Sequence, residues 1–221
     1  MFLLRLPGVY RPQGDTRMLA QALGRLALPP GGRILDLGTG TGALAVIAAR
    51  GPEAEVTAID LSLRAVLSAR FNAVLRGLRL RVIRGNLFAP VDGERFDLIL
   101  ANPPYVPGIE AQPAPHSASR AWNAGADGRR LLDRICRHAS AHLTSGGTLL
   151  LVQSSLSGVR ESLYRLRCEG LAAEVVARQL EPFGPVMRGR AKLLEAHGLI
   201  SPGQRHEELV VIRADRTRNA A

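Results

Sequence analysis

The chain has 221 residues, of which 46% are hydrophobic and 22% are charged, so it can bury a core in one domain of ordinary size. Aromatic residues make up only 4% of the chain, which argues against an extended stacking surface for single-stranded nucleic acid. The apolar stretch at the N-terminus is too short for a signal peptide, and no run approaches the roughly 18 apolar residues of a membrane span. We therefore expect a cytoplasmic protein with no membrane segment.

The net charge of +10 comes almost entirely from arginine. Lys192 is the only lysine among 29 basic residues, and the arginines are scattered along the chain rather than gathered in one run. Such a charge can attract nucleic acid or an acidic partner through counterion release and long-range steering. Compositional bias and an acidic or RNA-containing partner both explain it, and the sequence does not separate them.

Strand and helix signals alternate from Arg33 onward, which is typical of a mostly parallel sheet with helices on both faces. The prediction is a doubly wound α/β fold with one seven-stranded sheet. The predicted strands cover residues 33–38, 56–60, 80–86, 96–102, 148–154, 173–179 and 209–214. Residues 1–32 are expected to form a lead-in segment with a helix, and residues 33–221 a single domain.

Helices are predicted between these strands. In residues 62–76, Ser62 is a candidate N-cap, and the apolar side chains at helical spacing are Leu63, Leu67, Phe71 and Val74. In residues 127–142, Asp127 is the candidate cap, and the expected buried stripe comprises Leu131, Leu132, Ile135, Ala139 and Leu143. A third helix is predicted over residues 157–168.

Two stretches interrupt the alternation, a Pro- and Ala-rich segment over residues 106–125 and a segment over residues 181–207. Long loops in compact domains are usually functional or mobile. The first segment has little apolar surface to bury, so we expect it to become ordered only when a substrate binds.

A glycine-rich sequence, DLGTGTG over residues 36–42, follows the first predicted strand and leads into a helix. Glycines let the backbone approach a ligand closely, and the start of a helix offers unpaired N–H groups. About twenty residues later Asp60 ends the second strand, where a carboxylate can accept the hydroxyl protons of a ribose. A nucleotide-containing cofactor is therefore predicted here. Its candidate contacts are Asp36, Gly38, Thr39, Gly40, Gly42 and Asp60.

The glycine-rich loop alone does not identify the cofactor. Gly38, Gly40 and Ala43 also satisfy the fingerprint of nicotinamide dinucleotide binding, and a plain glycine turn with a capping Asp is a further interpretation. Asp36 directly precedes the loop and is acidic, which favours a ligand with a cationic group. The amino group of S-adenosyl-L-methionine is such a group.

A second motif, Asn102-Pro103-Pro104-Tyr105, follows the apolar strand over residues 96–102. Two successive prolines end a strand and fix the backbone, so the Asn102 amide and the Pro103 carbonyl can be held rigidly at the carboxyl edge of the sheet. Ligands of open α/β sheets bind at that edge. The motif is therefore predicted to lie beside the cofactor.

Methylation of a planar nitrogen needs such an arrangement, because the lone pair of an amide or aromatic amine is delocalised. The Asn102 side-chain oxygen and the Pro103 carbonyl can each accept one N–H, which favours a pyramidal nitrogen directed at a methyl donor. Tyr105 can stack on the planar group. Positioning alone can remove roughly 7–11 kcal/mol of a barrier, so no general base is required.

Asn86 and Leu87 follow the third predicted strand, where Asn86 can accept an adenine amine and Leu87 can lie against the ring. A simple turn residue is the alternative interpretation of Asn86. His138 and His142 lie one helical turn apart, but no third ligand accompanies them, so no metal site is expected.

Together these residues resemble the class I methyltransferases of the HemK/PrmC type, which methylate the side-chain amide of a glutamine in translation release factors. The resemblance covers nearly the whole chain. Residues 8–16, with the sequence GVYRPQGDT, resemble the lead-in of that family and imply that Thr16 lies near the cofactor. Residues 36–42, Asp60 and the Asn102–Tyr105 motif match its cofactor and substrate motifs.

Residues 122–129, with the sequence WNAGADGR, are similar to a Trp-Ala-Gly-Gly stretch in the shorter eukaryotic and archaeal branch of the family. Two features depart from the pattern. Asn86 stands where the family usually has Asp, and only 32 residues precede the first strand, whereas the bacterial branch carries a separate helical domain there. Docking of a release factor through that domain is therefore not expected.

The resemblance implies an enzyme that uses S-adenosyl-L-methionine to methylate a protein glutamine, with a release factor as its substrate and a small partner subunit. The Asn-Pro-Pro-Tyr motif also resembles that of methyltransferases acting on exocyclic amines in nucleic acid, although no domain able to flip a base is evident. A small-molecule methyltransferase, a nicotinamide-dependent oxidoreductase and a non-catalytic nucleotide-binding module are the remaining alternatives.

Overall fold

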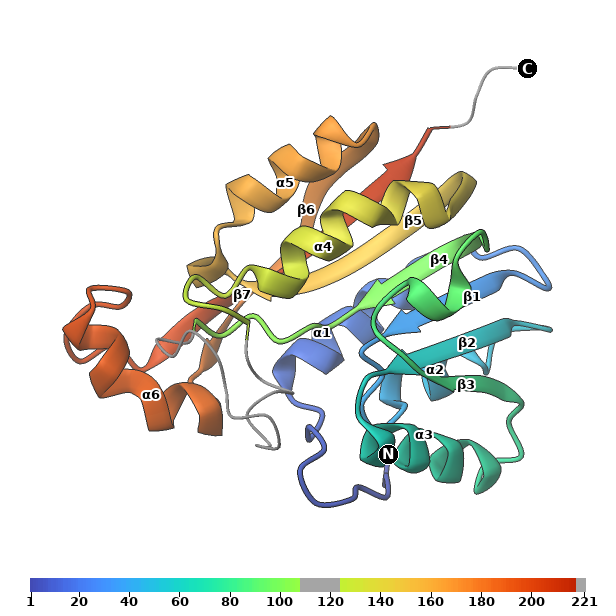
Figure 1. Ribbon diagram of the computed structural model, residues 1–221, viewed down its shortest axis with the longest axis horizontal. Coiled ribbons are helices and arrows are strands. Elements are labelled where there is room, and N and C mark those ends of the chain that lie inside the picture. Colours follow the sequence, from blue (N-terminus) through green and yellow to red (C-terminus); the bar gives the residue numbers. More distant parts are fainter. Residues whose placement is uncertain (108–123, 218–221) are drawn as a thin grey trace.

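One seven-stranded sheet runs through the centre of the molecule, with the strand order β3-β2-β1-β4-β5-β7-β6 (Figure 1). The computed structural model describes residues 1–107 and 124–217. Only β7 is antiparallel to its neighbours, which confirms the predicted mostly parallel sheet. The strands are β1 (Arg33–Leu37), β2 (Glu55–Asp60), β3 (Leu80–Arg84), β4 (Phe96–Ala101), β5 (Leu143–Ser154), β6 (Leu171–Pro182) and β7 (His206–Arg216).

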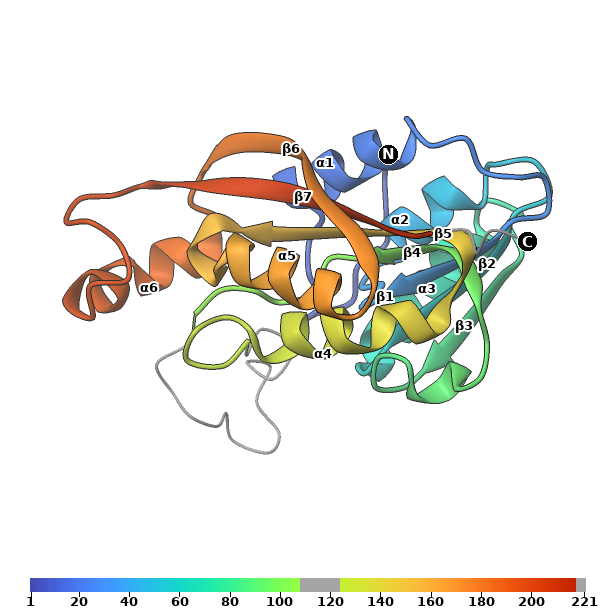
Figure 2. The ribbon, with the colours of Figure 1, turned by 90° about the horizontal axis from the view of Figure 1, so that it is seen from above.

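Helices cover both faces of this sheet, as predicted for a doubly wound fold. The helices are α1 (Gly14–Leu23), α2 (Ala43–Ala48), α3 (Leu63–Val74), α4 (Arg130–His138), α5 (Val159–Cys168) and α6 (Pro185–Ala196). Helices α1 and α2 lie on one face, and α4 and α5 lie on the other (Figure 2). Helix α6 lies beyond the end of β6 and β7 (Figure 1).

The main core lies on the central strands. β1 and β4 are buried over nearly their whole length, because each is covered by helices on both faces and flanked by strands on both sides. This explains why most of their residues are apolar rather than alternating apolar and polar, with Asp36 in β1 and Asp97 in β4 as exceptions. Met18 and Leu19 of α1 belong to the same core, so the lead-in helix packs on the sheet. The predicted boundary at residue 33 remains a prediction.

The helix predicted over residues 62–76 is present as α3, and Ser62 caps it, since its Oγ accepts a hydrogen bond from the Ala65 N–H at 3.4 Å. The predicted apolar stripe, however, does not face the core. The stripe residues are 45–75% exposed, and they are Leu63, Leu67, Phe71 and Val74. The buried face instead consists of the smaller side chains of Ala65, Val66, Ser68, Ala69, Asn72 and Ala73.

Close packing is the reason for this reversal. The Cα and Cβ of Ala69 lie so near the loop after β1 that a Cβ added to Gly42 would meet them at 3.0 Å. A leucine in place of Ala69 would force the helix away from this loop, so only small side chains fit there. The larger apolar side chains consequently point to solvent.

Two further predictions need correction. The segment over residues 181–207 is not a continuous loop, because it contains α6, which begins with Pro185 in its first turn and buries Met187 and Leu194 in a second small core with Phe183. The helix predicted over residues 127–142 is shorter, since α4 begins at Arg130, and a short 3-10 helix (Ala139–His142) follows it. Asp127 accepts a hydrogen bond from the Arg129 N–H at 2.9 Å, one residue before the helix begins.

Candidate active site

The carboxyl ends of β1, β2 and β4 meet at one edge of the sheet. β1 lies between the other two, and the chain proceeds from β1 to β2 on one side but returns on the opposite side as β4. Open α/β sheets bind ligands at such a change of direction. Gly38 follows β1, Asp60 ends β2 and Asn102 follows β4, and a Cβ on Gly38 would lie 4.0 Å from the Asn102 carbonyl oxygen. The predicted motifs are therefore brought together.

The glycine-rich loop turns sharply at this edge. Gly38, Gly40 and Gly42 all have positive φ, at 69°, 56° and 79°, a region in which only glycine is free of steric cost. The N–H groups of Gly38 and Thr39 donate to the Ile59 carbonyl at 2.8 and 3.0 Å, which ties the loop to β2. The loop is thus a fixed concave backbone between β1 and α2.

Asp36 lies buried beneath this loop. Its Oδ2 accepts hydrogen bonds from Thr39 Oγ1 at 2.6 Å and from the Ala45 N–H at 3.1 Å. Burial raises the pKa of Asp36 to about 6, although both hydrogen bonds act in the opposite direction. A cation bound next to this carboxylate would relieve the cost of its burial.

Asp60 ends β2, and its carboxylate accepts hydrogen bonds from two backbone segments. Oδ2 accepts from the Gly40 N–H at 2.9 Å, and Oδ1 accepts from the Ser62 N–H at 2.8 Å. Burial raises its pKa, and the backbone hydrogen bonds oppose that shift. Asp60 therefore joins the glycine loop to the start of α3, and its predicted bond to a ribose stays a prediction.

The predicted adenine contacts lie at the end of β3. Asn86 is exposed, and its Oδ1 accepts a hydrogen bond from Arg134 Nη1 of α4 at 3.1 Å. Leu87 has a φ of 51°, the left-handed region that a leucine rarely adopts. Local strain of this kind is typical of functional sites. The adenine role of both residues stays a prediction.

The Asn-Pro-Pro-Tyr motif is anchored by side chains from distant parts of the chain. Asn102 Nδ2 donates to Thr16 Oγ1 of α1 at 3.3 Å. Tyr105 is only 8% exposed, its hydroxyl donates to Asp15 Oδ2 at 3.2 Å, and its carbonyl accepts from Ser157 Oγ at 2.6 Å. Pro103 is buried and Pro104 is half-buried. Asn102 and Tyr105 are therefore both held in place by α1.

Sequence reasoning missed the polar cluster beneath this motif. Asp15 is buried, and its carboxylate accepts hydrogen bonds from Tyr10, Thr16 and Tyr105. Burial raises the pKa of Tyr10 and Tyr105 well above the usual value, and the charge of Asp15 adds to the shift. The available signal was an acidic residue directly before Thr16 in the lead-in segment, within which a helix was predicted.

Arg129 is a second residue that sequence reasoning did not single out. Its guanidinium is buried and donates to the carbonyl oxygens of Ser157 and Gly158, to Asp133 Oδ1 and to Ser162 Oγ. Gly128 has a φ of 75°, and a Cβ there would lie 2.3 Å from the Tyr105 carbonyl oxygen. These two residues fix the segment that packs against the carbonyl of Tyr105.

Some predictions fall outside the described residues. Trp122 and Asn123 lie in the segment 108–123, as does most of the loop expected to order on substrate binding, so that expectation stays a prediction. Within residues 1–107 and 124–217, no helix is long and apolar enough to cross a membrane. Across the same ranges, no cluster of three or more His, Cys, Asp or Glu side chains is suited to a metal ion.

Comparison with known proteins identifies the family. The family model described as the methyltransferase small domain matches residues 2–118. The chain belongs to this family. It is 33% identical over 181 residues, 82% of this chain and 90% of the relative, to a Methanocaldococcus jannaschii protein named as a protein N5-glutamine methyltransferase.

Bacterial relatives and a solved structure agree with this family. The chain is 43% identical over 148 residues to the release factor glutamine methyltransferase of Deinococcus radiodurans, which is 65% of this chain and 52% of that protein. It spans about half the length of the bacterial release factor glutamine methyltransferases that it matches. The structure of the E. cuniculi Mtq2-Trm112 complex, which methylates the translation termination factor eRF1, has a TM-score of 0.65 and 24% identity, covering 95% of this chain and 99% of that one.

Proposed function

We propose that this protein is an S-adenosyl-L-methionine-dependent N-methyltransferase that methylates the side-chain amide of a glutamine in a protein. The observation that carries the proposal is the anchored Asn102 side chain beside the glycine-rich loop. Its Nδ2 donates to Thr16, so its Oδ1 is the atom left to accept a hydrogen bond from a substrate amide. This arrangement suits an acceptor that carries two N–H groups on a planar nitrogen.

The chemistry rests on orientation of a poor nucleophile. The Asn102 side-chain oxygen and the Pro103 carbonyl each accept one N–H of the substrate amide, which favours a pyramidal nitrogen with a usable lone pair. S-adenosyl-L-methionine supplies an electrophilic methyl group on sulfur. Tyr105 packs beside the planar group, and its burial keeps water from that side. The N–C bond would form as the S–C bond of the cofactor breaks, S-adenosyl-L-homocysteine would be the leaving group, and the surplus N–H proton would pass to water. No general base is needed for the transfer, because positioning supplies much of the rate increase.

The residues present fit the cofactor. The glycine turns leave a backbone surface without side chains, which a Cβ would fill, and the buried Asp36 carboxylate gains from a cationic amino group. Asp60 is the candidate for the ribose hydroxyls, and Asn86 and Leu87 are the candidates for adenine. Thr16, Gly38, Thr39, Gly40 and Gly42 complete the candidate cofactor residues.

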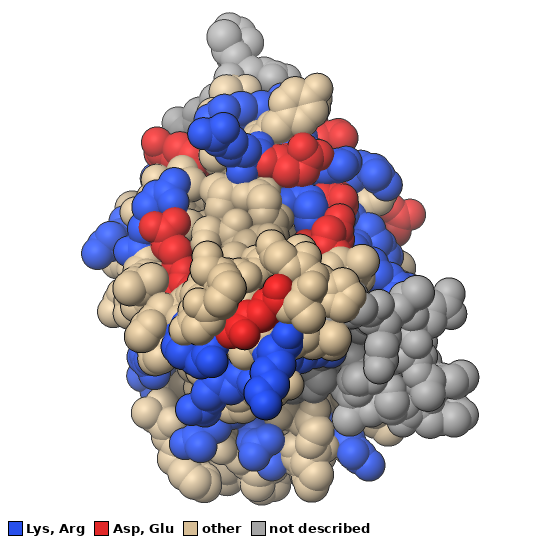
Figure 3. Space-filling model, turned by 90° about the vertical axis from the view of Figure 1, so that its left-hand side faces the viewer, with Lys and Arg blue, Asp and Glu red and all other residues tan. Residues whose placement is uncertain are grey.

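A translation release factor is the protein substrate that the relatives favour. The names of the bacterial relatives assign glutamine methylation of release factors to those proteins. An exocyclic amine of nucleic acid presents the same two N–H groups to Asn102 and is the alternative acceptor. In the upper part of the face shown in Figure 3, basic and acidic side chains lie close together, whereas basic side chains predominate in its lower part, so nucleic acid is included in the test below.

Methyl transfer from labelled S-adenosyl-L-methionine tests this proposal. The purified protein is incubated in parallel with a release factor, with DNA and RNA, and with the small-molecule fraction of a cell extract. The proposal expects label on a release-factor glutamine, located by mass spectrometry, and its loss in Asn102→Ala. Label only on nucleic acid or on small molecules would assign a different acceptor.

We further propose that a small partner subunit covers the exposed apolar face of α3. This face comprises the stripe Leu63, Leu67, Phe71 and Val74 together with Leu75, all of which are at least 45% exposed. Contiguous apolar patches of this kind are typical of interaction sites, whereas single exposed leucines are not. The similar E. cuniculi protein was solved in complex with a second protein, Trm112.

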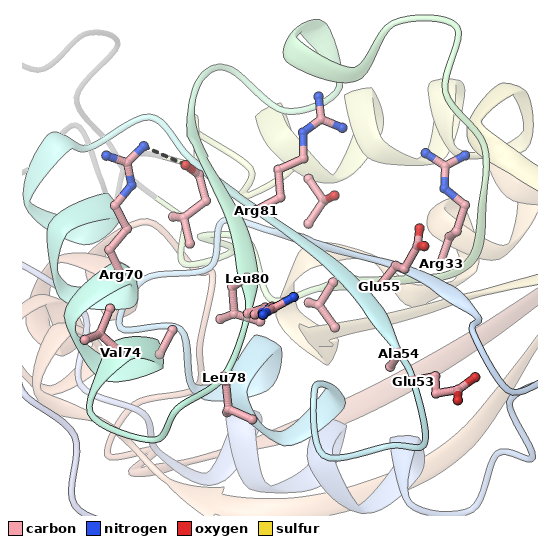
Figure 4. Close-up of a pocket in the computed structure, with 14 residues that line it drawn as sticks. Arg33, Glu53, Ala54, Glu55, Arg70, Val74, Leu78, Leu80 and Arg81 are labelled. Carbon is pink, nitrogen blue, oxygen red and sulfur yellow. Dashed lines mark hydrogen bonds between the residues drawn. The ribbon is translucent and has the colours of Figure 1, made fainter.

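A groove between α3 and β3, the edge strand of the sheet, continues this face (Figure 4). Val74, Leu78 and Leu80 line it, together with charged residues that include Arg70 and Glu55. Mixed charges and a concave shape fit a protein better than an anionic membrane surface, which the carboxylates would repel. Edge strands that carry unpaired backbone groups are also common docking sites for other proteins.

The charges around this groove indicate the chemistry of the partner. Arg70 and Arg79 line it and form no ion pair with the described residues, whereas Arg81 binds Glu94 at 2.8 Å. Glu53 and Glu55 also line it without an ion pair to the described residues. The partner that fits this face therefore carries an apolar strip bordered by carboxylates that meet the arginines and by basic groups that meet Glu53 and Glu55. In this proposal, the arginines of the groove, which contribute to the large positive charge of the chain, bind the partner.

Substitution of the α3 face tests the partner proposal. Leu67→Ser together with Phe71→Ser should raise the solubility of the isolated protein and abolish co-purification with a small protein from the native host. Tyr164→Ser, at an exposed aromatic on α5, is the matched control and should leave co-purification unchanged. If the α3 variant still co-purifies with the partner, the partner binds elsewhere. If the wild-type protein binds anionic lipid vesicles and the α3 variant does not, the α3 face binds a membrane instead.

A further inference from the structure

Asp15 lies at the centre of the polar cluster beneath the candidate active site. It is the second residue of α1 and is 3% exposed. Its Oδ1 accepts from the Thr16 N–H at 2.5 Å and from Thr16 Oγ1 at 3.1 Å, and its Oδ2 accepts from the hydroxyls of Tyr10 at 2.8 Å and Tyr105 at 3.2 Å. These four hydrogen bonds account for the roughly four lone-pair sites of a carboxylate.

An ionised carboxylate can only accept hydrogen bonds, so it decides the direction of every bond around it. The hydroxyls of Tyr10, Thr16 and Tyr105 must each direct their proton toward Asp15. Their lone pairs are then turned outward, to accept from other donors. Gln13 Nε2 donates to the Tyr10 hydroxyl at 3.0 Å, which is consistent with this direction.

The same rule extends to Asn102. Thr16 Oγ1 uses its single proton in the hydrogen bond to Asp15, so it can only accept a hydrogen bond from the Asn102 side chain. The contact of 3.3 Å between the Asn102 side chain and Thr16 Oγ1 therefore requires the Nδ2 end of the amide to face Thr16. The Oδ1 end must then face away from Thr16, where it can accept a hydrogen bond from a substrate amide.

We propose that Asp15, acting through Thr16, is a positioning residue that selects the orientation of the Asn102 amide. This inference rests on the proposed function for the use of Oδ1, but the orientation itself does not depend on that function. Without the carboxylate, the Thr16 hydroxyl is free to donate to Asn102. The amide can then turn over and present Nδ2, a donor, to the substrate N–H groups, which it would repel.

Neighbouring acidic groups do not replace Asp15 in this role. Glu207 and Glu181 lie close enough for their charges to interact with this region, and burial raises the pKa of Glu207. No hydrogen bond joins either glutamate to Thr16 or Asn102 among the bonds of the described residues. Glu181 accepts instead from Gln179 Nε2 at 2.6 Å. The direction of the Thr16 hydroxyl is therefore set by Asp15.

The first experiment measures the orientation directly, in the free protein. The two side-chain protons on Asn102 Nδ2 are assigned by ¹H–¹⁵N NMR, as the pair of signals that Asn102→Ala removes. In Asp15→Asn and in Thr16→Val these signals should move or broaden, because the bond to Thr16 is lost or reversed. Tyr10→Phe is the matched control: it removes another hydrogen bond to Asp15 but leaves the branch to Asn102 intact, so the signals should stay in place.

The second experiment is a double-mutant cycle on methyl transfer. Asp15→Asn should lower kcat by roughly tenfold or more in the wild-type background, with a much smaller change in the Kd of S-adenosyl-L-methionine. In the Asn102→Ala background the same change should have almost no further effect, because its target is gone. A purely structural role would lower kcat by the same factor in both backgrounds.

The outcomes separate this inference from the proposed function. Unmoved Asn102 signals in both Asp15→Asn and Thr16→Val, or an additive cycle, would overturn the positioning role. Near-normal turnover in Asn102→Ala would instead overturn the proposed function, while the NMR result would still report on Asp15. Thr16→Val keeps the carboxylate and both tyrosines, so it remains informative if Asp15→Asn fails to fold.

Discussion

The polar cluster beneath the candidate active site and the apolar face of α3 differ in both the type and the burial of their side chains. Around Asp15 and Asn102 the side chains are polar and largely buried, and each hydrogen bond fixes the direction of the next. On α3 the side chains are apolar and exposed, and nothing in the described chain covers them. Buried polar groups are costly unless satisfied, and exposed apolar patches are costly unless covered.

The two regions differ in whether they need a second molecule to be stable. The polar cluster needs no other molecule to be stable, so it is a rigid, preorganised support for the Asn-Pro-Pro-Tyr motif. The α3 face gains free energy only when another surface removes it from water. Changes in the first region should therefore affect catalysis, whereas changes in the second should leave the stability of the isolated protein nearly unchanged.

The largest effect is expected at Asn102. Asn102→Ala removes one preorganised contact at the reacting centre, which typically lowers turnover by roughly 100- to 1,000-fold, while the affinity for S-adenosyl-L-methionine should stay within about tenfold. Asn102→Asp keeps an acceptor oxygen, but its negative charge can bind the cofactor while displacing the amide. Steady-state kinetics and calorimetry on both variants decide this, and near-normal turnover in Asn102→Ala would exclude the amide-orienting role.

A smaller loss is expected at Asp60. Asp60→Ala should weaken S-adenosyl-L-methionine binding by about 1.5–3 kcal/mol, the scale of hydrogen bonds to a charged group. Isothermal calorimetry measures it directly. Because Asp60 also holds the Gly40 N–H and the Ser62 N–H, thermal unfolding of the variant is the necessary control. An unchanged Kd would mean that another group binds the ribose.

Asp36 should make cofactor binding depend on pH. Its pKa in the free protein is raised to about 6, so it becomes protonated as the pH falls below 6. A bound ammonium group favours the ionised form, so affinity should be full above pH 6 and fall up to about tenfold per pH unit below it. Asp36→Asn should bind more weakly with a flat profile between pH 5 and 7. If the affinity of the wild type for S-adenosyl-L-methionine does not change with pH, the amino group of the cofactor does not bind next to Asp36.

The stability of the free protein should show the opposite trend. A carboxyl whose pKa is raised by folding binds its proton more tightly in the folded state. The contribution of Asp36 to stability is therefore greatest below its unfolded pKa of about 4, and declines as the pH rises toward 6. Denaturant unfolding of the wild type and of Asp36→Asn over this range isolates the contribution. An identical pH dependence in both would show that Asp36 is not protonated near pH 6.

The smallest effect is expected on α3. Val74→Ser changes a side chain that is 75% exposed, so the free energy of unfolding should shift by no more than about 0.5 kcal/mol. Ala69→Leu on the buried face of the same helix is the contrasting variant, and overpacking there should cost about 1–3 kcal/mol. If both variants change the free energy of unfolding equally, the face of α3 that contains Ala69 is not the buried one.

Much of this protein was determined by the sequence itself. Parallel strands end at one edge, so a glycine-rich loop, a carboxylate and an Asn-Pro-Pro-Tyr motif after successive strands must converge there once the strands are recognised. Ser62 was recognisable as a cap because a short hydroxyl side chain before a helix satisfies a free N–H. The apolar residues before Asn102 likewise indicated the strand that became β4.

Other features were decided only by the tertiary structure. Helical spacing identified an apolar stripe on α3 but not which face meets the sheet, because Gly42 and Ala69 must pack closely and only small side chains permit it. The boundaries of α4 and the presence of α6 depended on packing against Phe183 and on the position of Arg129. The role of Asp15 was hidden for the same reason. Its partners Tyr105 and, through Thr16, Asn102 are about 90 residues away in sequence, and only folding places them within hydrogen-bonding distance.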